Sequence, residues 1–426
     1  MSEFIRRLKF AGVGRLFAGT TLTAILLAGA PAQATDGYFA TGYGAQSKGL
    51  AGAGLAYPKD SLALATNPAA ATTLGNRWDV GVDIFTPKRS AAFRGTGLDR
   101  SFDGDGQPIA FIPEAGWVRQ VGDRLAVGLV AYGNGGMITD YKSNPFARYG
   151  ATGQAGVELQ QLFVSPTIAY RFAEGQSIGL AANIAGQTFR ARGLGPFAAF
   201  SQSPTNFTDK GVDTAWGYGV RAGYLGRLTD RLSLGAFWQS KTSFDAFRKY
   251  RGLFAEGGDF DAPSTYGAGV AFKATPRLDL VAEWRRIELS KVKSVGTPLA
   301  ALFAGRPFGA SDGPGFGWRD VDVVKLGANY WVNDAWQVRA GYDHAGNPIP
   351  ASQTLLNIIA PAVVTDQFAL GATWSGPSGL EVSGYAQYSP KKTVRGSGSI
   401  PAMLGGGEAD ISMSQAVVGV SLGWKY

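Results

Sequence analysis

The sequence contains no cysteine and only one histidine, His344. The missing cysteine excludes disulfides, thiolate metal sites and cysteine nucleophiles, and one imidazole cannot form a histidine metal cluster. Lys and Arg do not form runs interleaved with aromatic residues, as a nucleic-acid surface would require. We therefore expect no metal site, no cofactor and no nucleic-acid partner.

Long hydrophobic runs are also missing beyond residue 34, where no stretch of 18 apolar residues could form a membrane-spanning helix. The chain is nevertheless 45% hydrophobic and 12% aromatic, and it contains 61 glycines. Abundant aromatic residues and glycine without a spanning helix favour a β-barrel over a helical bundle.

The N-terminal residues have the pattern of a secretory signal. Basic residues (Arg6, Arg7, Lys9 and Arg15) precede an apolar stretch over 16–28, and Ala32-Gln33-Ala34 has the small residues of a cleavage site. The apolar stretch is too short for an inner-membrane anchor. We predict a signal peptide over residues 1–34 and export to the bacterial outer membrane.

Period-2 alternation organises the rest of the chain. One face of 77–85 presents Trp78, Val80, Val82 and Ile84, whereas the other presents arginine, aspartate or glycine. Such alternation places apolar and polar side chains on opposite faces of a β-strand. It recurs along the chain, for example over 232–238, 278–284, 324–330, 368–374 and 416–424. The pattern by itself is compatible with a soluble two-sheet protein.

The connections between these strands alternate in length. Short turns are expected at 121–124, 173–176, 228–231, 274–277, 332–334 and 376–379. Long connections are expected at roughly 86–108, 134–159, 191–213, 242–263, 290–318, 344–364 and 389–411. Six turns and seven loops join fourteen strands, and short turns on one rim with long loops on the other are typical of transmembrane barrels. We predict an all-β fold, a 14-stranded antiparallel transmembrane β-barrel over 77–426.

Aromatic residues near the strand ends are expected to form interfacial girdles. They are Trp78, Trp117, Tyr132, Trp238, Trp284, Tyr330, Trp336, Trp374 and Tyr426.

Residues 35–76 do not read as a wall strand. They are rich in Gly and Ala and contain the turn-forming pair Asn67-Pro68. A barrel of fourteen strands encloses an open channel unless something fills it. We predict that this segment is an N-terminal hatch, a plug inside the lumen.

Two groups of side chains are candidates for ligand binding. Arg221, Lys325 and Arg339 share the polar face of their strands. They are either charges kept away from lipid or a clamp for a carboxylate. Phe197, Phe200 and Phe254 lie in long loops, where exposed apolar clusters indicate ligand capture unless the loops pack against themselves.

At its motifs the chain resembles the OmpP1/FadL/TodX family of long-chain fatty acid and aromatic-hydrocarbon transporters. Asn67-Pro68-Ala69 looks like the Asn-Pro-Ala element at the end of the family's hatch, and 49–54 is similar to the small-residue stretch before it. Further similar stretches are 232–241 and 336–343, the latter followed by Pro348 and Pro350.

The resemblance implies passive transport of hydrophobic compounds and exit sideways through the wall near a kinked third strand. That strand is expected at about 125–133, where Gly133 and Gly135 allow a bend. Asn67, Pro68 and Ala69 are expected to form a rigid corner of the gate. The partners are then a hydrophobic small molecule and outer-membrane lipid, and we expect a monomer. The alternatives are a porin for hydrophilic solutes and a barrel-embedded hydrolase.

Catalysis is not expected. Two G-x-S-x-G matches place Ser177 at the start of a strand and Ser311 in a long loop, whereas the motif acts at a strand-to-helix elbow. A hydrolase would also depend on His344 as its base, which we interpret as a bystander in a loop. We predict that the chain is not an enzyme.

Overall fold

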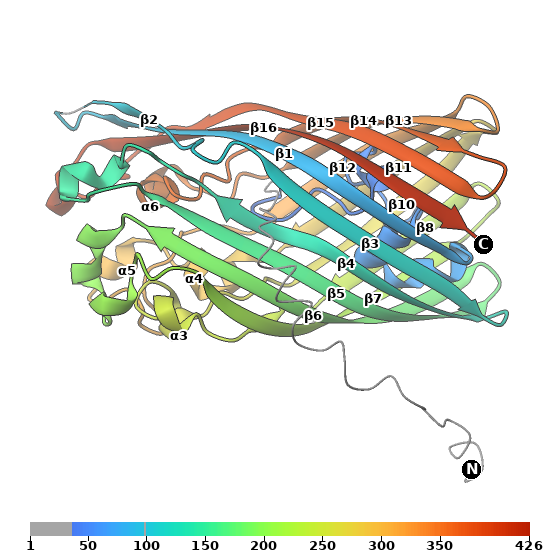
Figure 1. Ribbon diagram of the computed structural model, residues 1–426, viewed down its shortest axis with the longest axis horizontal. Helices are drawn as coiled ribbons and strands as arrows, with labels where there is room; N and C mark the ends of the chain where they lie inside the picture. Colours follow the sequence, from blue (N-terminus) through green and yellow to red (C-terminus); the bar gives the residue numbers. More distant parts are fainter. Residues whose placement is uncertain (1–35, 98) are drawn as a thin grey trace, which may run out of the picture.

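The computed structural model describes residues 36–97 and 99–426, so the predicted signal peptide lies outside the described residues. In this part of the chain one antiparallel sheet closes on itself, because the last strand, β16 (Glu408–Lys425), pairs with the first, β1 (Arg77–Arg94). Closure leaves no sheet edge with unpaired backbone groups, as a wall in lipid requires. Figure 1 shows the barrel from the side.

Fourteen strands form the wall, as predicted. Between β1 and β16 they run in chain order, each paired with its neighbours. They are β3 (Ala110–Val121), β4 (Leu125–Ile138), β5 (Gly156–Ala173), β6 (Gln176–Arg192), β7 (Asp213–Arg227), β8 (Leu232–Gln239), β10 (Thr265–Thr275), β11 (Leu278–Ile287), β12 (Val321–Trp331), β13 (Trp336–Ala345), β14 (Asp366–Ser375) and β15 (Leu380–Val394). Two short strands, β2 (Ser101–Asp103) and β9 (Ser243–Phe244), pair with β1 and β7 near the long loops.

The six predicted turns lie on one rim and the long connections on the other (Figure 1). Several strands extend further than their apolar alternation indicates. β1 continues to Arg94, paired residue by residue with β16, although the first loop was expected from residue 86. Backbone pairing needs no apolar face once a strand has left the hydrocarbon layer. The apolar alternation therefore underestimated the length of these strands.

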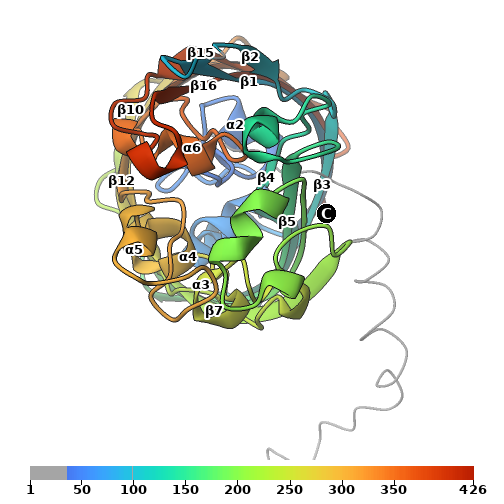
Figure 2. The same cartoon turned by 90° about the vertical axis from the view of Figure 1, so that its left-hand side faces the viewer.

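Short helices fold the long loops over their rim, where Figure 2 looks onto them. They are α3 (Ala255–Gly258), α4 (Lys293–Gly296), α5 (Ala300–Phe303) and α6 (Thr354–Asn357), with 3-10 helices at Pro145–Tyr149, Gly195–Phe200, Pro204–Asn206, Arg248–Tyr250, Leu289–Lys291, Ala351–Gln353 and Ala402–Leu404. Among the described residues, no helix is long and apolar enough to cross a membrane.

The two faces of the wall differ in the predicted sense. Large apolar side chains point outward and stay exposed, including Val82, Leu180, Leu326, Leu370 and Val420. The predicted girdle residues Trp78, Trp117, Trp238, Trp284, Tyr330, Trp336 and Tyr426 are likewise exposed. Tyr132 is an exception, because it is fully buried in the lumen and its hydroxyl accepts a hydrogen bond from Arg221. Its girdle assignment was wrong, because Tyr132 shares the inward register of Ala126, Gly128 and Val130 in β4.

Residues 36–76, here called the inner segment, lie inside the barrel, toward the short-turn rim (blue in Figures 1 and 2). They contain α2 (Ala45–Lys48) and two 3-10 helices, Ser61–Ala65 and Pro68–Thr73. Most of their side chains are buried. Wall glycines make room for them: a Cβ on Gly341 of β13 would lie 2.1 Å from the carbonyl carbon of Leu50. Lumen-side glycine therefore reflects the close approach of the inner segment.

Candidate functional site

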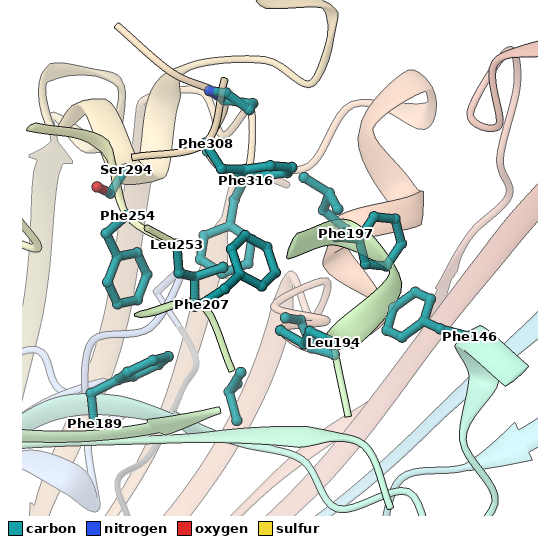
Figure 3. A pocket seen from close by; sticks show the side chains of 15 residues that line it. Phe146, Phe189, Leu194, Phe197, Phe207, Leu253, Phe254, Ser294, Phe308 and Phe316 are labelled. Atoms are coloured by element: carbon teal, nitrogen blue, oxygen red, sulfur yellow. The ribbon is translucent and has the colours of Figure 1, made fainter. Parts of the chain in front are cut away.

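An apolar cavity lies among the long loops, and we call it the loop cavity. It is lined by residues from five loops and two strands, namely Phe146, Val157, Phe189, Leu194, Phe197, Phe207, Leu253, Phe254, Ser294, Phe308, Pro314, Gly315, Phe316, Leu356 and Ile359. Figure 3 shows the phenylalanine rings converging on it. Its volume is about 40 Å³, which is more than one water needs and small for a long chain.

The rings around the loop cavity hold one another by aromatic contacts. Phe189 and Phe254 have ring centroids 4.6 Å apart, and Phe146 meets Phe197 edge-on at 5.1 Å. Edge-to-face pairs of this kind stabilise a packed cluster by about 0.5–1.5 kcal/mol each beyond burial. Since Phe146, Phe197 and Phe254 come from three different loops and Phe189 comes from β6, these contacts join the loops to one another and to the wall around the cavity.

Ser294 is the one hydroxyl in the lining, and its Oγ already donates to the backbone carbonyl of Asp259 at 2.5 Å. Burial, followed by the nearby charge of Asp261, raises the pKa of Asp259 to about 7. None of the side chains that line the cavity carries a charge. Such a lining suits an uncharged apolar molecule.

Of the loop aromatics predicted from sequence, Phe197 and Phe254 line the loop cavity and are buried. Phe200 does not line it and is 39% exposed. Phe146, Phe189, Phe207, Phe308 and Phe316 were missed. Aromatic residues in long connections were a usable signal for four of them, whereas Phe189 lies in β6 and only its inward register could have indicated it.

The three candidate basic residues are buried in the lumen, as alternation predicted, and each contacts the inner segment. Lys325 Nζ lies 3.0 Å from Asp36 and 2.7 Å from Asp343. Arg221 donates to the carbonyl of Leu64 at 3.2 Å, and Arg339 donates to Gln46 at 3.3 Å. These contacts match the interpretation of charges kept off the lipid, while a ligand-binding role for the three residues stays a prediction.

Sequence reasoning missed a second set of lumen ion pairs. Lys48 of α2 lies 2.8 Å from Glu114 and also pairs with Asp83, and all three side chains are buried. Arg77 pairs with Asp79 at 2.6 Å and with Glu381 at 2.9 Å. Alternation predicts that such residues face inward but not which charges meet, because partners such as Arg77 and Glu381 are 304 positions apart in sequence.

Asn67 and Pro68 form the expected corner. Asn67 caps the 3-10 helix Pro68–Thr73, with Oδ1 accepting from the backbone of Ala69 at 3.1 Å. Its Nδ2 donates to the carbonyls of Leu55 and Tyr224. A Cβ on Gly179 of β6 would lie 2.4 Å from the backbone nitrogen of Ala69. The corner is thus fastened to β6 and β7.

Gly133 and Gly135 lie within β4 and not in the loop after it. The register of β4 against β5 shifts between them, which marks a bulge. Pairing of β4 with β3 ends at Ala131. Beyond that point the inner segment forms hydrogen bonds with β4. Gly136 donates its backbone N–H to the carbonyl of Tyr38 at 2.8 Å, and Ala40 donates its backbone N–H to the carbonyl of Asn134 at 3.1 Å. Over residues 110–114, β3 therefore pairs with β1 and not with β4.

A smaller cavity of about 20 Å³, here called the wall cavity, lies near the first residue of β3, Ala110, which pairs with Phe85. Its lining comes from β1, from the end of β4, from the loop between β13 and β14, and from β16. The residues are Phe85, Pro87, Arg89, Gly136, Met137, Ile138, Thr139, Ala360, Pro361, Ala362 and Met413. Ile359 lines the loop cavity and Ala360 the wall cavity. Residues 359–362 thus separate the two cavities.

The enzyme motifs do not converge. Ser177 begins β6 after a turn, and its hydroxyl accepts from Thr72, while Ser311 lies in the loop after β11. His344 lies in β13 and not in a loop, with Nδ1 2.9 Å from Asp366 at the surface. In the range 36–426, residue 98 excepted, no group of three His, Cys, Asp or Glu is placed to hold a metal.

Comparisons with known proteins give one matching family and several similar structures. Residues 25–420 match the model of the family described as outer membrane protein transport protein (OMPP1/FadL/TodX). No curated protein matches the chain in sequence. A *Pseudomonas aeruginosa* FadL homologue is similar in structure, with a TM-score of 0.69 and 19% identity over 93% of this chain and 99% of that one.

Two toluene transporters are also similar in structure. *P. putida* TodX has a TM-score of 0.66 and 18% identity over 91% of this chain and 99% of its own. *Ralstonia pickettii* TbuX has a TM-score of 0.65 and 17% identity over the same shares. At these identities the likeness establishes the fold.

Proposed function

The chain belongs to the outer membrane protein transport family (OMPP1/FadL/TodX), and from this premise we propose that it is a passive outer-membrane transporter of hydrophobic compounds. The observation that carries the proposal is the loop cavity, whose lining is almost wholly apolar and which lies among the long loops of a closed barrel. The printed titles of the similar structures, which include two toluene transporters, support the same class of substrate.

The path begins at the loops and leads inward. A hydrophobic molecule enters the loop cavity because transfer from water to an apolar lining is favourable. Residues 359–362 separate it from the wall cavity, and they are held by two hydrogen bonds: Thr139 and Tyr141 donate to the carbonyls of Ile359 and Ile358, both at 2.8 Å. A small displacement of this strip would join the two cavities.

Exit occurs sideways, between β3 and β4, where residues 110–114 of β3 do not pair with β4. An apolar solute released there enters the lipid directly and avoids the aqueous periplasm. The inner segment acts as the hatch, with Asn67, Pro68 and Ala69 as its fixed corner and Tyr38–Ala40 as the part that meets Gly135. Substrates need neither a metal nor a catalytic group on this path, so we expect no enzymatic activity.

The proposal also includes the setting of the protein. The outward apolar face contacts outer-membrane lipid, the signal peptide is removed near Ala34, and the barrel acts as a monomer because its own wall closes without a partner strand.

Uptake by cells treated with a protonophore tests the function. We expect labelled toluene to enter cells that contain the protein faster than cells that lack it, with or without the protonophore. Entry that stops with the protonophore would contradict passive transport. The rival, an open porin, predicts a large, steady, ohmic current in planar bilayers, whereas the proposed transporter passes almost none.

The glycines of β4 provide a test of the sideways exit. A Cβ on Gly135 would lie 2.2 Å from the carbonyl oxygen of Tyr38, and valine also resists the bulge. We expect Gly133→Val with Gly135→Val to lower toluene uptake about tenfold in barrels that still show heat-modifiable migration. Gly384→Val in β15 is the control, since its Cβ meets nothing closer than 3.8 Å. Unchanged uptake in the double variant would remove the sideways exit.

A further inference from the structure

Arg89, which lines the wall cavity, has one hydrogen-bond donor that no described residue accepts. Arg89 of β1 lines the cavity and is 3% exposed. Its Nη2 donates to the carbonyl of Gln107 at 3.0 Å, and its Nε lies 3.4 Å from Asp105. Its Nη1 is buried and has no hydrogen-bond partner among the described residues. A buried donor without a partner is costly, so it favours any acceptor that can reach it.

We propose that the wall cavity is a binding site for the uncharged oxygen acceptor of an otherwise apolar ligand, such as a ketone, an ester or an alcohol. The remaining lining side chains are mostly apolar, and the Thr139 hydroxyl is already engaged with Ile359 and the backbone of Val157. One cavity wall therefore offers a donor, and the others offer apolar contact. The volume of about 20 Å³ leaves room for at least one water-sized polar group.

The charges around Arg89 explain why the acceptor is uncharged. The guanidinium already faces the carboxylate of Asp105, which also accepts the backbone N–H of Arg89 at 2.6 Å. Asp103 accepts the N–H of Asp105, and Asp140 lies at the end of β4, paired with Arg192. A ligand carboxylate would enter a site whose positive charge is already balanced, and burying such an unpaired charge is unfavourable. A neutral carbonyl or hydroxyl oxygen needs only the Nη1–H.

The two cavities then select for different parts of a ligand. The loop cavity has no free donor and accepts a plain hydrocarbon, whereas the wall cavity, across residues 359–362, favours a hydrocarbon that carries oxygen. This inference rests on the proposed function, because a ligand must pass from the loops toward the wall. It adds a preference for oxygenated compounds at the exit.

The test uses two ligands of nearly the same shape, acetophenone and α-methylstyrene, which differ in a carbonyl oxygen against a methylene group. Binding to purified protein in nanodiscs is measured for the unmodified chain and for Arg89→Met. A hydrogen bond to a charged donor corresponds to roughly a tenfold gain in affinity or more. We expect Arg89→Met to weaken acetophenone at least tenfold and to leave α-methylstyrene within about twofold.

Two further variants keep the test decisive. Arg89→Lys retains the charge beside Asp105 but lacks the Nη1 donor. If Arg89→Met does not fold, Arg89→Lys should show the same selective loss of acetophenone affinity. Asp105→Asn retains Arg89 and removes the balancing charge, so it should preserve acetophenone binding and allow benzoate to bind. Equal changes for both ligands, or none, would mean that Arg89 meets only water and would overturn the site. Absence of binding by either ligand would overturn the proposed function as well.

Discussion

The two ends of the lumen contain different kinds of side chains. Toward the short turns, the inner segment is fastened to the wall by buried ion pairs such as Lys325 with Asp36 and Lys48 with Glu114. Toward the long loops, phenylalanine rings pack around a cavity with almost no polar group. Ion pairs and hydrogen bonds require defined geometry, whereas apolar contacts tolerate sliding and exchange. We infer that one end seals the lumen and the other end takes up substrate.

The polar end also retains a wide recess of about 570 Å³ at the short-turn rim, lined by Tyr57, Thr73, Arg171, Glu174 and Arg227 among others. Its lining differs from that of the loop cavity in carrying charges of both signs. Water can therefore reach the inner segment from this side, and the seal must come from the buried contacts above the recess.

The largest expected effect comes from removing the seal. A chain without residues 36–76 should change from almost no current to a large, steady, ohmic conductance in planar bilayers, because a fourteen-stranded barrel without its filling is wide enough for ions. Heat-modifiable gel migration checks that the shortened barrel has folded. A folded deletion variant that stays closed would show that the inner segment does not seal the lumen.

A smaller effect is expected from one fastening. Lys325→Met leaves Asp36 and Asp343 buried without their cation, which costs roughly 3–5 kcal/mol. We expect faster hydrogen exchange in residues 36–43 and intermittent current. Adding Asp343→Asn should restore part of the protection.

The matched control for this fastening is Arg94→Met, which removes an ion pair with Asp410 where Arg94 is 47% exposed and should leave the inner segment unaffected, because solvent screens an exposed pair. If both variants exchange alike, the buried pair does not hold the inner segment.

The smallest effect should appear at the apolar end. Phe197→Ala with Phe254→Ala removes two rings from the loop cavity, and we expect toluene affinity to fall about tenfold while conductance stays low. Phe200→Ala is the control, because that ring is exposed and does not line the cavity. Equal toluene affinity in the double variant and the control would show that the loop cavity does not capture the ligand.

The barrel could be predicted from the sequence because its signals are local. Alternation over 77–85 and short turns such as 173–176 each report on a few neighbouring residues, and closure follows from counting them. Alternation also predicted that Arg221, Lys325 and Arg339 face inward. Alternation did not predict their partners, because Lys325 and Asp36 are 289 positions apart and no local pattern relates them.

The candidate site was predicted less completely for the same reason. Phe197 and Phe200 look alike in sequence, but only Phe197 lines the loop cavity, whereas Phe200, the last residue of the 3-10 helix Gly195–Phe200, is exposed. The bend of β4 was expected from its glycines, whereas its partner, the backbone of Tyr38–Ala40, carries no sequence signal because backbone groups are common to all residues.

The most direct test of the account is a two-tracer uptake experiment, in which the same cells receive labelled toluene and a labelled hydrophilic solute of similar size. The account predicts that the protein raises toluene entry and leaves entry of the hydrophilic solute at the level of cells that lack it. Faster entry of the hydrophilic solute, with toluene entry unchanged, would contradict the division between a sealed polar end and an apolar uptake end.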